Sequence, residues 1–185
     1  MKKLSEEILF KGKWLSVKHA HFLNSRGQEV MWETVVRNKK ESSVIIVPVL
    51  MPSRRIVLIK QYRLPLEDYV IGFPAGMTDG NPDQAFKELK EETGYVGKIV
   101  GESPALQVNS GLLDEKTKIV VMHIDENDPL NQNPRQALEP TEEIEVLLVP
   151  HDQVYSFLLA QGKRGMRIAA GVWNVFGVQL HINNQ

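Results

Sequence analysis

The segment between Asn81 and Gly94 constrains the fold more than any other part of the chain, because it carries both ends of a helix. Asn81-Pro82-Asp83 supplies an N-cap residue, a proline at the first helical position and an early acid. Thr93-Gly94 supplies a C-terminal stop. The sequence therefore predicts a helix over about residues 82–93.

Three carboxylates crowd one edge of this predicted helix. Glu88 and Glu92 are one helical turn apart and Glu91 lies beside them, while Ala85 and Leu89 can face a core. Two interpretations are open. Oxygen ligands at positions i and i+4 suit Mg²⁺ or Mn²⁺ together with substrate phosphates, whereas an acidic face with neighbouring lysines can simply be solvated.

Runs of β-branched residues surround this helix and predict strands. Two further helices are expected near residues 152–161 and 167–180. A proline-rich polar loop over residues 125–143 is long for a compact domain, which indicates a functional segment, and its composition suggests a lid that orders on binding. The predicted strands cover residues 44–50, 56–62, 119–124 and 144–149.

The N-terminal part of the chain predicts a small antiparallel region. Residues 14–18 and 30–36 form a hairpin through a glycine-containing turn at residues 24–28. A hairpin of this size folds poorly alone, so it must pack on the main body or on a second copy. We expect an N-terminal β-hairpin region over residues 1–41 and a main domain over residues 42–185.

Composition excludes several classes of function. The chain has no cysteine, so a thiol nucleophile, a disulfide framework and a cysteine zinc site are absent. Its net charge of −1 gives no electrostatic footprint for nucleic acid or an anionic membrane. No stretch approaches the roughly 20 apolar residues of a membrane helix. With acids arriving early after Met1, we expect no secretory signal and a cytoplasmic location.

The residues around the helix resemble a known motif. Gly76-Met77-Thr78-Asp79-Gly80, followed by Lys87-Glu88-Leu89-Lys90-Glu91-Glu92-Thr93-Gly94-Tyr95, looks like a Nudix box, G-x5-E-x7-R-E-U-x-E-E-x-G-U. The loop is three residues shorter than the motif, which leaves only Asp79 as a weak counterpart of its first glutamate. Lys87 replaces the motif's arginine and loses the bidentate fork.

The resemblance extends to the ADP-sugar pyrophosphatase branch of Nudix hydrolases, which includes ADP-ribose and GDP-mannose pyrophosphatases. It implies an α/β fold, namely a Nudix α/β/α sandwich with a mixed sheet plus a small N-terminal antiparallel β domain. It also implies a homodimer with exchanged or embracing hairpins. The segments that carry it are Gly12-Lys13-Trp14, Trp32-Glu33-Thr34-Val35-Val36-Arg37, Lys60-Gln61-Tyr62-Arg63, Phe73-Pro74-Ala75-Gly76 and Glu145-Val146-Leu147-Leu148-Val149-Pro150.

In this family the helix carboxylates hold two or three Mg²⁺ ions, with Mn²⁺ as the alternative. The resemblance makes Glu88 and Glu92 the principal ligands, and gives Glu91 a further ligand, orienting or catalytic role. The carbonyl of Ala75 completes the metal site. The resemblance also assigns Gly76 and Met77 to substrate binding.

The general base of this branch is usually a glutamate on the loop before the last predicted strand. Glu142 is the first choice by counting back from residues 145–146, and Glu143 is the second. An acidic, solvated loop tip is the alternative for either residue.

The resemblance also implies residues that bind the substrate. Trp14 and Trp32 would stack on the nucleobase and Glu33 would bind its edge, while Arg37 and Arg63 would bind the diphosphate or terminal sugar. Tryptophans that anchor a core and arginines in surface ion pairs are the alternatives.

The implied reaction is hydrolysis of the phosphoanhydride of a nucleoside diphosphate sugar, with ADP-ribose giving AMP and ribose 5-phosphate. Ser110 stands where ADP-ribose enzymes of this branch often have proline, and Lys87 is reminiscent of GDP-mannose enzymes. GDP-mannose or broad specificity therefore stays open, as does a catalytically silent nucleotide-sugar sensor.

Overall fold

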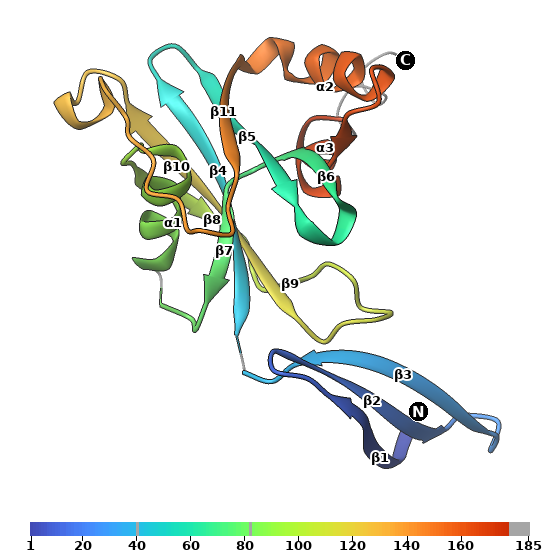
Figure 1. Cartoon of the computed structure of the whole chain (residues 1–185). Helices are drawn as coiled ribbons and strands as arrows, with labels where there is room; N and C mark the ends of the chain where they lie inside the picture. Colours follow the sequence, from blue (N-terminus) through green and yellow to red (C-terminus); the bar gives the residue numbers. More distant parts are fainter. Residues whose placement is uncertain (40, 82, 178–185) are drawn as a thin grey trace. The chain divides into compact units, whose positions relative to one another are not determined.

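A computed structural model describes residues 1–39, 41–81 and 83–177. The chain divides into two compact units (Figure 1). The N-terminal unit contains Met1–Ser43, Met77–Asn81 and Pro104–Lys118. The core unit contains the described residues of Val44–Gly76, Pro82–Ser103 and Ile119–Gln185.

The N-terminal unit is built on a three-stranded antiparallel sheet of β1 (Lys2–Lys11), β2 (Leu15–Leu23) and β3 (Glu29–Arg37). The predicted hairpin is confirmed as β2 and β3, and the side chain of Asn24 accepts hydrogen bonds from the backbone N–H groups of Arg26 and Gln28 in the turn. The sequence did not predict β1, all of whose residues are exposed. A short strand, β9 (Leu106–Gln107), completes this unit.

The core unit is built on a mixed sheet in the order β12-β6-β5-β4-β10-β8. Most of its strand pairs are antiparallel, whereas β12 runs parallel to β6. The four predicted strands are confirmed as β4, β5, β10 and β11. The strands are β4 (Ser42–Met51), β5 (Arg55–Arg63), β6 (Asp68–Gly72), β7 (Ala75–Thr78), β8 (Lys98–Glu102), β10 (Lys116–Asp125), β11 (Ile144–Pro150) and β12 (Arg167–Ile168).

Helices cover both faces of this sheet, because successive strand residues enter different cores. In β4, Ile46 packs with Leu89 of α1 (Asp83–Thr93), whereas Val47 packs with the residues of α2 (Val154–Lys163) and α3 (Ala170–Phe176). Figure 1 shows α2 and α3 together at the end of the sheet that holds β6. The α/β/α arrangement predicted from the sequence is therefore confirmed.

The last predicted helix was wrong at its start. Residues 167–168 form β12, which pairs with β6, and the helix begins only at Ala170. The side chain of Arg167 binds Asp68 and the N–H of Ala169 binds the carbonyl of Ile71, so tertiary contacts hold this stretch extended. Pro82 and residues 178–180 of the predicted helices lie outside the described residues. Across the described ranges, no helix is long and apolar enough to cross a membrane.

Candidate active site

The candidate site forms where α1 packs against the start of β7. Glu92 is 2% exposed, and its Oε2 accepts a hydrogen bond of 3.0 Å from the N–H of Ala75. Glu88 lies one turn earlier, and a Cβ at Gly76 would stand 2.1 Å from its Cδ. Only glycine lets the strand pass this close to the carboxylate. The packing therefore brings together Ala75, Gly76, Glu88 and Glu92, as the sequence predicted.

Burial disfavours the ionised form of both carboxyl groups and so raises their pKa values. Desolvation raises the pKa of Glu92 to about 8, which the N–H of Ala75 and the charge of Arg63 oppose, while Glu142 and Glu88 add to the rise. Burial also raises the pKa of Glu88, although the amide of Gln84 donates a 2.6 Å hydrogen bond to it. The interior thus holds two carboxyl groups that a divalent cation would favour in their ionised form.

Glu91 faces a different environment from its two neighbours. Its carboxylate lies 3.4 Å from Nζ of Lys87, one turn earlier on the helix. This contact raises the pKa of Lys87. Lys87, which replaces the motif's arginine, is therefore already paired within α1.

The loop over residues 125–143 is anchored to the end of α1, and the expectation that it closes as a lid on binding stays a prediction. The N–H of Ala137 donates to the carbonyl of Glu91 at 2.9 Å, and the amide of Gln136 donates to the carbonyl of Glu92 at 2.6 Å. A side chain at Gly94 would meet the backbone of Arg135. These bonds satisfy helix carbonyls that lack helical partners and hold the loop at residues 135–137.

The two candidate bases occupy different positions at the end of this loop. Glu142 is close enough to the helix carboxylates that its charge raises the pKa of both Glu88 and Glu92. Glu143 instead accepts a hydrogen bond from the hydroxyl of Tyr69, and this bond raises the pKa of the tyrosine. Glu143 is therefore held at β6, away from the helix pair.

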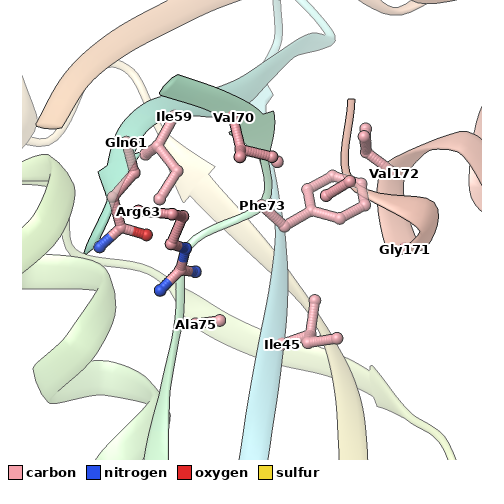
Figure 2. Close-up of a pocket in the computed structure, with 11 residues that line it drawn as sticks. Ile45, Ile59, Gln61, Arg63, Val70, Phe73, Ala75, Gly171 and Val172 are labelled. Atoms are coloured by element: carbon pink, nitrogen blue, oxygen red, sulfur yellow. The ribbon is translucent and has the colours of Figure 1, made fainter. Parts of the chain in front are cut away.

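A pocket of about 140 Å³ is lined in part by Ala75, whose N–H is bonded to Glu92, and it lies where the sheet splits. β4 pairs with β5 at Val49 and Ile56. Further along β5, Ile59 and Gln61 have β6 on one edge and β11 on the other, so β4 cannot pair there. Figure 2 shows Gln61 and Arg63 projecting from β5 toward Ala75, which also lines the pocket.

Arg63 was predicted to bind substrate, and it lines this pocket, whereas Gln61 was missed. Gln61 is 7% exposed and its Oε1 has no hydrogen-bond partner within the described residues. A signal for it existed in the sequence. Val57, Ile59 and Gln61 alternate along β5, and the first two are buried, so the strand period places an amide where the pattern calls for an apolar side chain.

The N-terminal unit carries the predicted nucleobase residues on β3 and just before β2. Trp14 and Trp32 are both more than half exposed. Trp14 and Arg37 line one pocket of about 410 Å³ within this unit. Glu33 is exposed on β3 opposite His19, and Met77 belongs to this unit at the end of β7.

Residues 109–115, of which the sequence analysis singled out only Ser110, lie along β3. Gly111 accepts a 2.9 Å hydrogen bond from the indole N–H of Trp32, and Leu112 accepts one from the N–H of Val35 at 2.9 Å. Nε of Arg37 lies 3.2 Å from a carboxylate oxygen of Glu115. The segment therefore holds the indole N–H edge of Trp32, whose side chain stays more than half exposed.

The donor set at α1 fits a hard divalent cation. It offers carboxylate oxygens of Glu88 and Glu92 beside the backbone of Ala75, where the charge of Arg63 acts on Glu92 and the charge of Lys87 acts on Glu88. No group of three or more His, Cys, Asp or Glu side chains is arranged as a metal site in the part of the chain that the structure describes.

Comparison with known proteins agrees with this geometry. The NUDIX domain family model matches residues 39–169. Putative nudix hydrolase 2 of Caenorhabditis elegans is 39% identical over 83% of this chain and 74% of its own length. ADP-sugar pyrophosphatase of Mus musculus is 32% identical over 98% and 88%, and ADP-ribose pyrophosphatase of Saccharomyces cerevisiae is 32% identical over 88% and 75%.

A solved structure supports the fold independently. The crystal structure of an ADP compounds hydrolase superposes with a TM-score of 0.68 and covers 86% of this chain and 84% of its own, at 23% identity. The family model spans well over half of the sequence, and its range includes α1 and the carboxylates that α1 buries. Together these findings show that the chain belongs to the Nudix family.

Proposed function

We propose that this Nudix hydrolase cleaves the diphosphate of a nucleoside diphosphate sugar, with ADP-ribose giving AMP and ribose 5-phosphate. The observation that carries the proposal is the pair Glu88 and Glu92, one turn apart on α1 and packed against Ala75 and Gly76. The printed names of the mouse and yeast relatives, an ADP-sugar and an ADP-ribose pyrophosphatase, support the substrate class.

Two or three Mg²⁺ ions, or Mn²⁺ in their place, are the cofactors in this proposal. Glu88, Glu92 and the carbonyl of Ala75 would hold them, with Glu91 adding a ligand once it leaves Lys87. When bound, the ions would neutralise the diphosphate, polarise the attacked phosphorus and lower the pKa of the attacking water.

Glu142 is the general base in this account, in preference to Glu143. Its charge acts on both helix carboxylates, whereas Glu143 is engaged by the hydroxyl of Tyr69. Glu142 takes the proton from water as the water oxygen bonds to phosphorus and the bond from phosphorus to the bridging oxygen breaks. Arg63 binds phosphate oxygens and balances their charge through the displacement.

The proposal also assigns residues to the nucleobase half of the substrate. The faces of Trp14 and Trp32 would stack on the base and Glu33 would bind its edge, while Arg37 would bind a phosphate after releasing Glu115. Exposed tryptophan rings that are fixed by one edge, as Trp32 is, lose little conformational freedom when a base stacks on them.

Product analysis by ion-exchange chromatography tests the proposal. The protein is incubated with ADP-ribose and with GDP-mannose, with Mg²⁺ and with excess chelator. We expect AMP from ADP-ribose only when metal is present. GMP as the main product would select the GDP-mannose alternative, and tight binding of either compound without product would select the nucleotide-sugar sensor.

We also propose that two copies associate through their N-terminal units. Ile8, Leu9 and Phe10 of β1 are each half exposed or more, and such a cluster of apolar side chains on one short strand favours burial against a partner. Light scattering after gel filtration should give a dimer for the wild type and a monomer for Phe10→Glu. Lys2→Glu on the same strand is the control and should remain dimeric. A monomeric wild type would contradict the proposal.

A further inference from the structure

The pocket in the split of the sheet contains an acceptor that neither the protein nor the proposed metal chemistry uses. Gln61 is 7% exposed, its Oε1 has no partner among the described residues, and its side chain lines the pocket (Figure 2). Most buried amide oxygens are hydrogen-bonded, so an exception requires an explanation. The terminal torsion of glutamine is broad, so a modest rotation turns this oxygen toward a donor in the pocket.

The size and lining of the pocket indicate what that donor belongs to. The volume of about 140 Å³ is several times the roughly 30 Å³ that one water occupies in the liquid. Ile45, Ile59 and Phe73 supply apolar walls, and Gln61 supplies the uncharged acceptor. Carbon surface combined with a hydroxyl donor is the chemistry of a sugar ring.

The position of the pocket identifies which part of a substrate would reach it. Arg63 lines the same pocket and is the cation suited to a phosphate. Ala75 lines it too, and the N–H of Ala75 is bonded to Glu92 of the proposed metal site. A group in this pocket is therefore a direct neighbour of the reacting diphosphate.

We infer that the pocket is the subsite for the terminal sugar of the nucleoside diphosphate sugar, and that Gln61 accepts a hydrogen bond from a sugar hydroxyl. The inference rests on the proposed function and adds a specificity-determining residue to it. Gln61 acts on binding of the sugar and takes no part in the chemical step.

The test compares two diphosphates that differ only at this end. ADP-ribose carries the sugar, and an ADP ester with an n-pentyl group on its second phosphate has five carbons and no terminal hydroxyl. The decisive variant is Gln61→Met, which keeps length and shape but removes the acceptor. We expect kcat/KM for ADP-ribose to fall about tenfold, mainly through KM, and kcat/KM for the pentyl ester to change less than about twofold.

Ile59→Val is the matched control, because it alters the same pocket without touching a polar atom. It should change kcat/KM for both compounds by the same factor. Gln61→Met should unfold at the same temperature as the wild type or a higher one, because it removes a buried oxygen that lacks a partner.

Two results would overturn the inference. If Gln61→Met lowers kcat/KM for both compounds equally, the amide does not read the terminal sugar, and a lower unfolding temperature would then assign it to packing. If neither value changes, the pocket does not bind that group. The failure of the proposed function looks different, because the wild-type chain would then hydrolyse neither compound in the presence of Mg²⁺.

Discussion

The core unit buries an acidic side chain, whereas the N-terminal unit exposes large aromatic ones. In the core unit, a carboxylate that water would normally solvate is buried at Glu92, with its pKa raised to about 8 by desolvation. In the N-terminal unit, Trp14, Trp32 and Phe10, which a core would normally take, are more than half exposed. Each arrangement costs free energy in the isolated chain. The proposed function explains each by a ligand: a cation in the first unit, and a base or a second copy in the other.

The largest effect is expected at Glu92. Glu92→Gln keeps the shape of the side chain and the hydrogen bond from Ala75, but it cannot supply a charged ligand. We expect turnover of ADP-ribose with Mg²⁺ to fall on the order of 10³-fold, while the metal-free protein stays at least as stable as the wild type. Steady-state kinetics and thermal unfolding measure the two quantities.

A second acid provides the control for that experiment. Glu126 forms an ion pair with Arg55 and accepts from the N–H of Ser53, far from any proposed chemistry. Glu126→Gln should lose stability and keep kcat, which is the reverse of the pattern at Glu92. If both variants lost stability and activity together, Glu92 would be a structural acid.

The next effect separates the two loop glutamates. Glu142→Gln should lower kcat about 10²-fold, as expected for loss of a general base, whereas Glu143→Gln should lower it only a few fold by freeing Tyr69. The measurement is kcat against pH for each variant. Equal losses, or a larger loss for Glu143→Gln, would assign the base to Glu143.

A smaller effect is expected in the N-terminal unit. Trp32→Leu removes a stacking surface worth about 1–3 kcal/mol per base, so KM for ADP-ribose should rise about tenfold with little change in kcat. Trp173→Leu, which alters an aromatic of the α3 core, should lower stability and leave KM unchanged. An unchanged KM for Trp32→Leu would show that Trp32 does not stack on the base, and contact with a second copy would then be the remaining explanation for its exposure.

The smallest effect concerns the metal-free protein and pH. Because the pKa of Glu92 rises from 4.5 to about 8 on folding, the folded chain holds a proton that the unfolded chain has released between these values. The free energy of unfolding should therefore fall as pH increases from 4.5 to 8, then level off. We expect a loss of about 1–2 kcal/mol after relaxation around the charge. Urea titrations of the wild type and Glu92→Gln should converge at pH 4 and diverge by pH 8.

The sequence predicted the elements whose local pattern agrees with their packing. The four β-branched strands and α1 carry strong periodicity and capping residues, and all are present. The strand β1 was missed because none of its side chains is buried, so it lacks the alternation that marks a half-buried strand. The stretch at residues 167–168 was misassigned because its conformation depends on Asp68 and Ile71, which lie about a hundred positions earlier in the chain.

Site residues that belong to a sequence motif could be predicted. Residues whose position depends only on tertiary structure were harder to predict. Glu88 and Glu92 follow from helix spacing and the resemblance to the Nudix box. Although the loop of that box is shortened, the backbone of Gly76 packs directly against the side chain of Glu88. The proposed preference for Glu142 over Glu143 rests on the position of Tyr69. The strand period of β5 marks Gln61 in the sequence, but the pocket beside it follows only from the split of the sheet.

The most direct test of the central account is a titration of Mn²⁺ followed by the electron paramagnetic resonance signal of the free ion. The wild type and Glu92→Gln are compared at pH 8.5, where the buried carboxyl can ionise. The account predicts that the wild type takes up Mn²⁺ and that Glu92→Gln binds it at least tenfold more weakly. Equal uptake by the two proteins would show that the buried carboxylate of α1 is not a metal ligand, and would contradict the account.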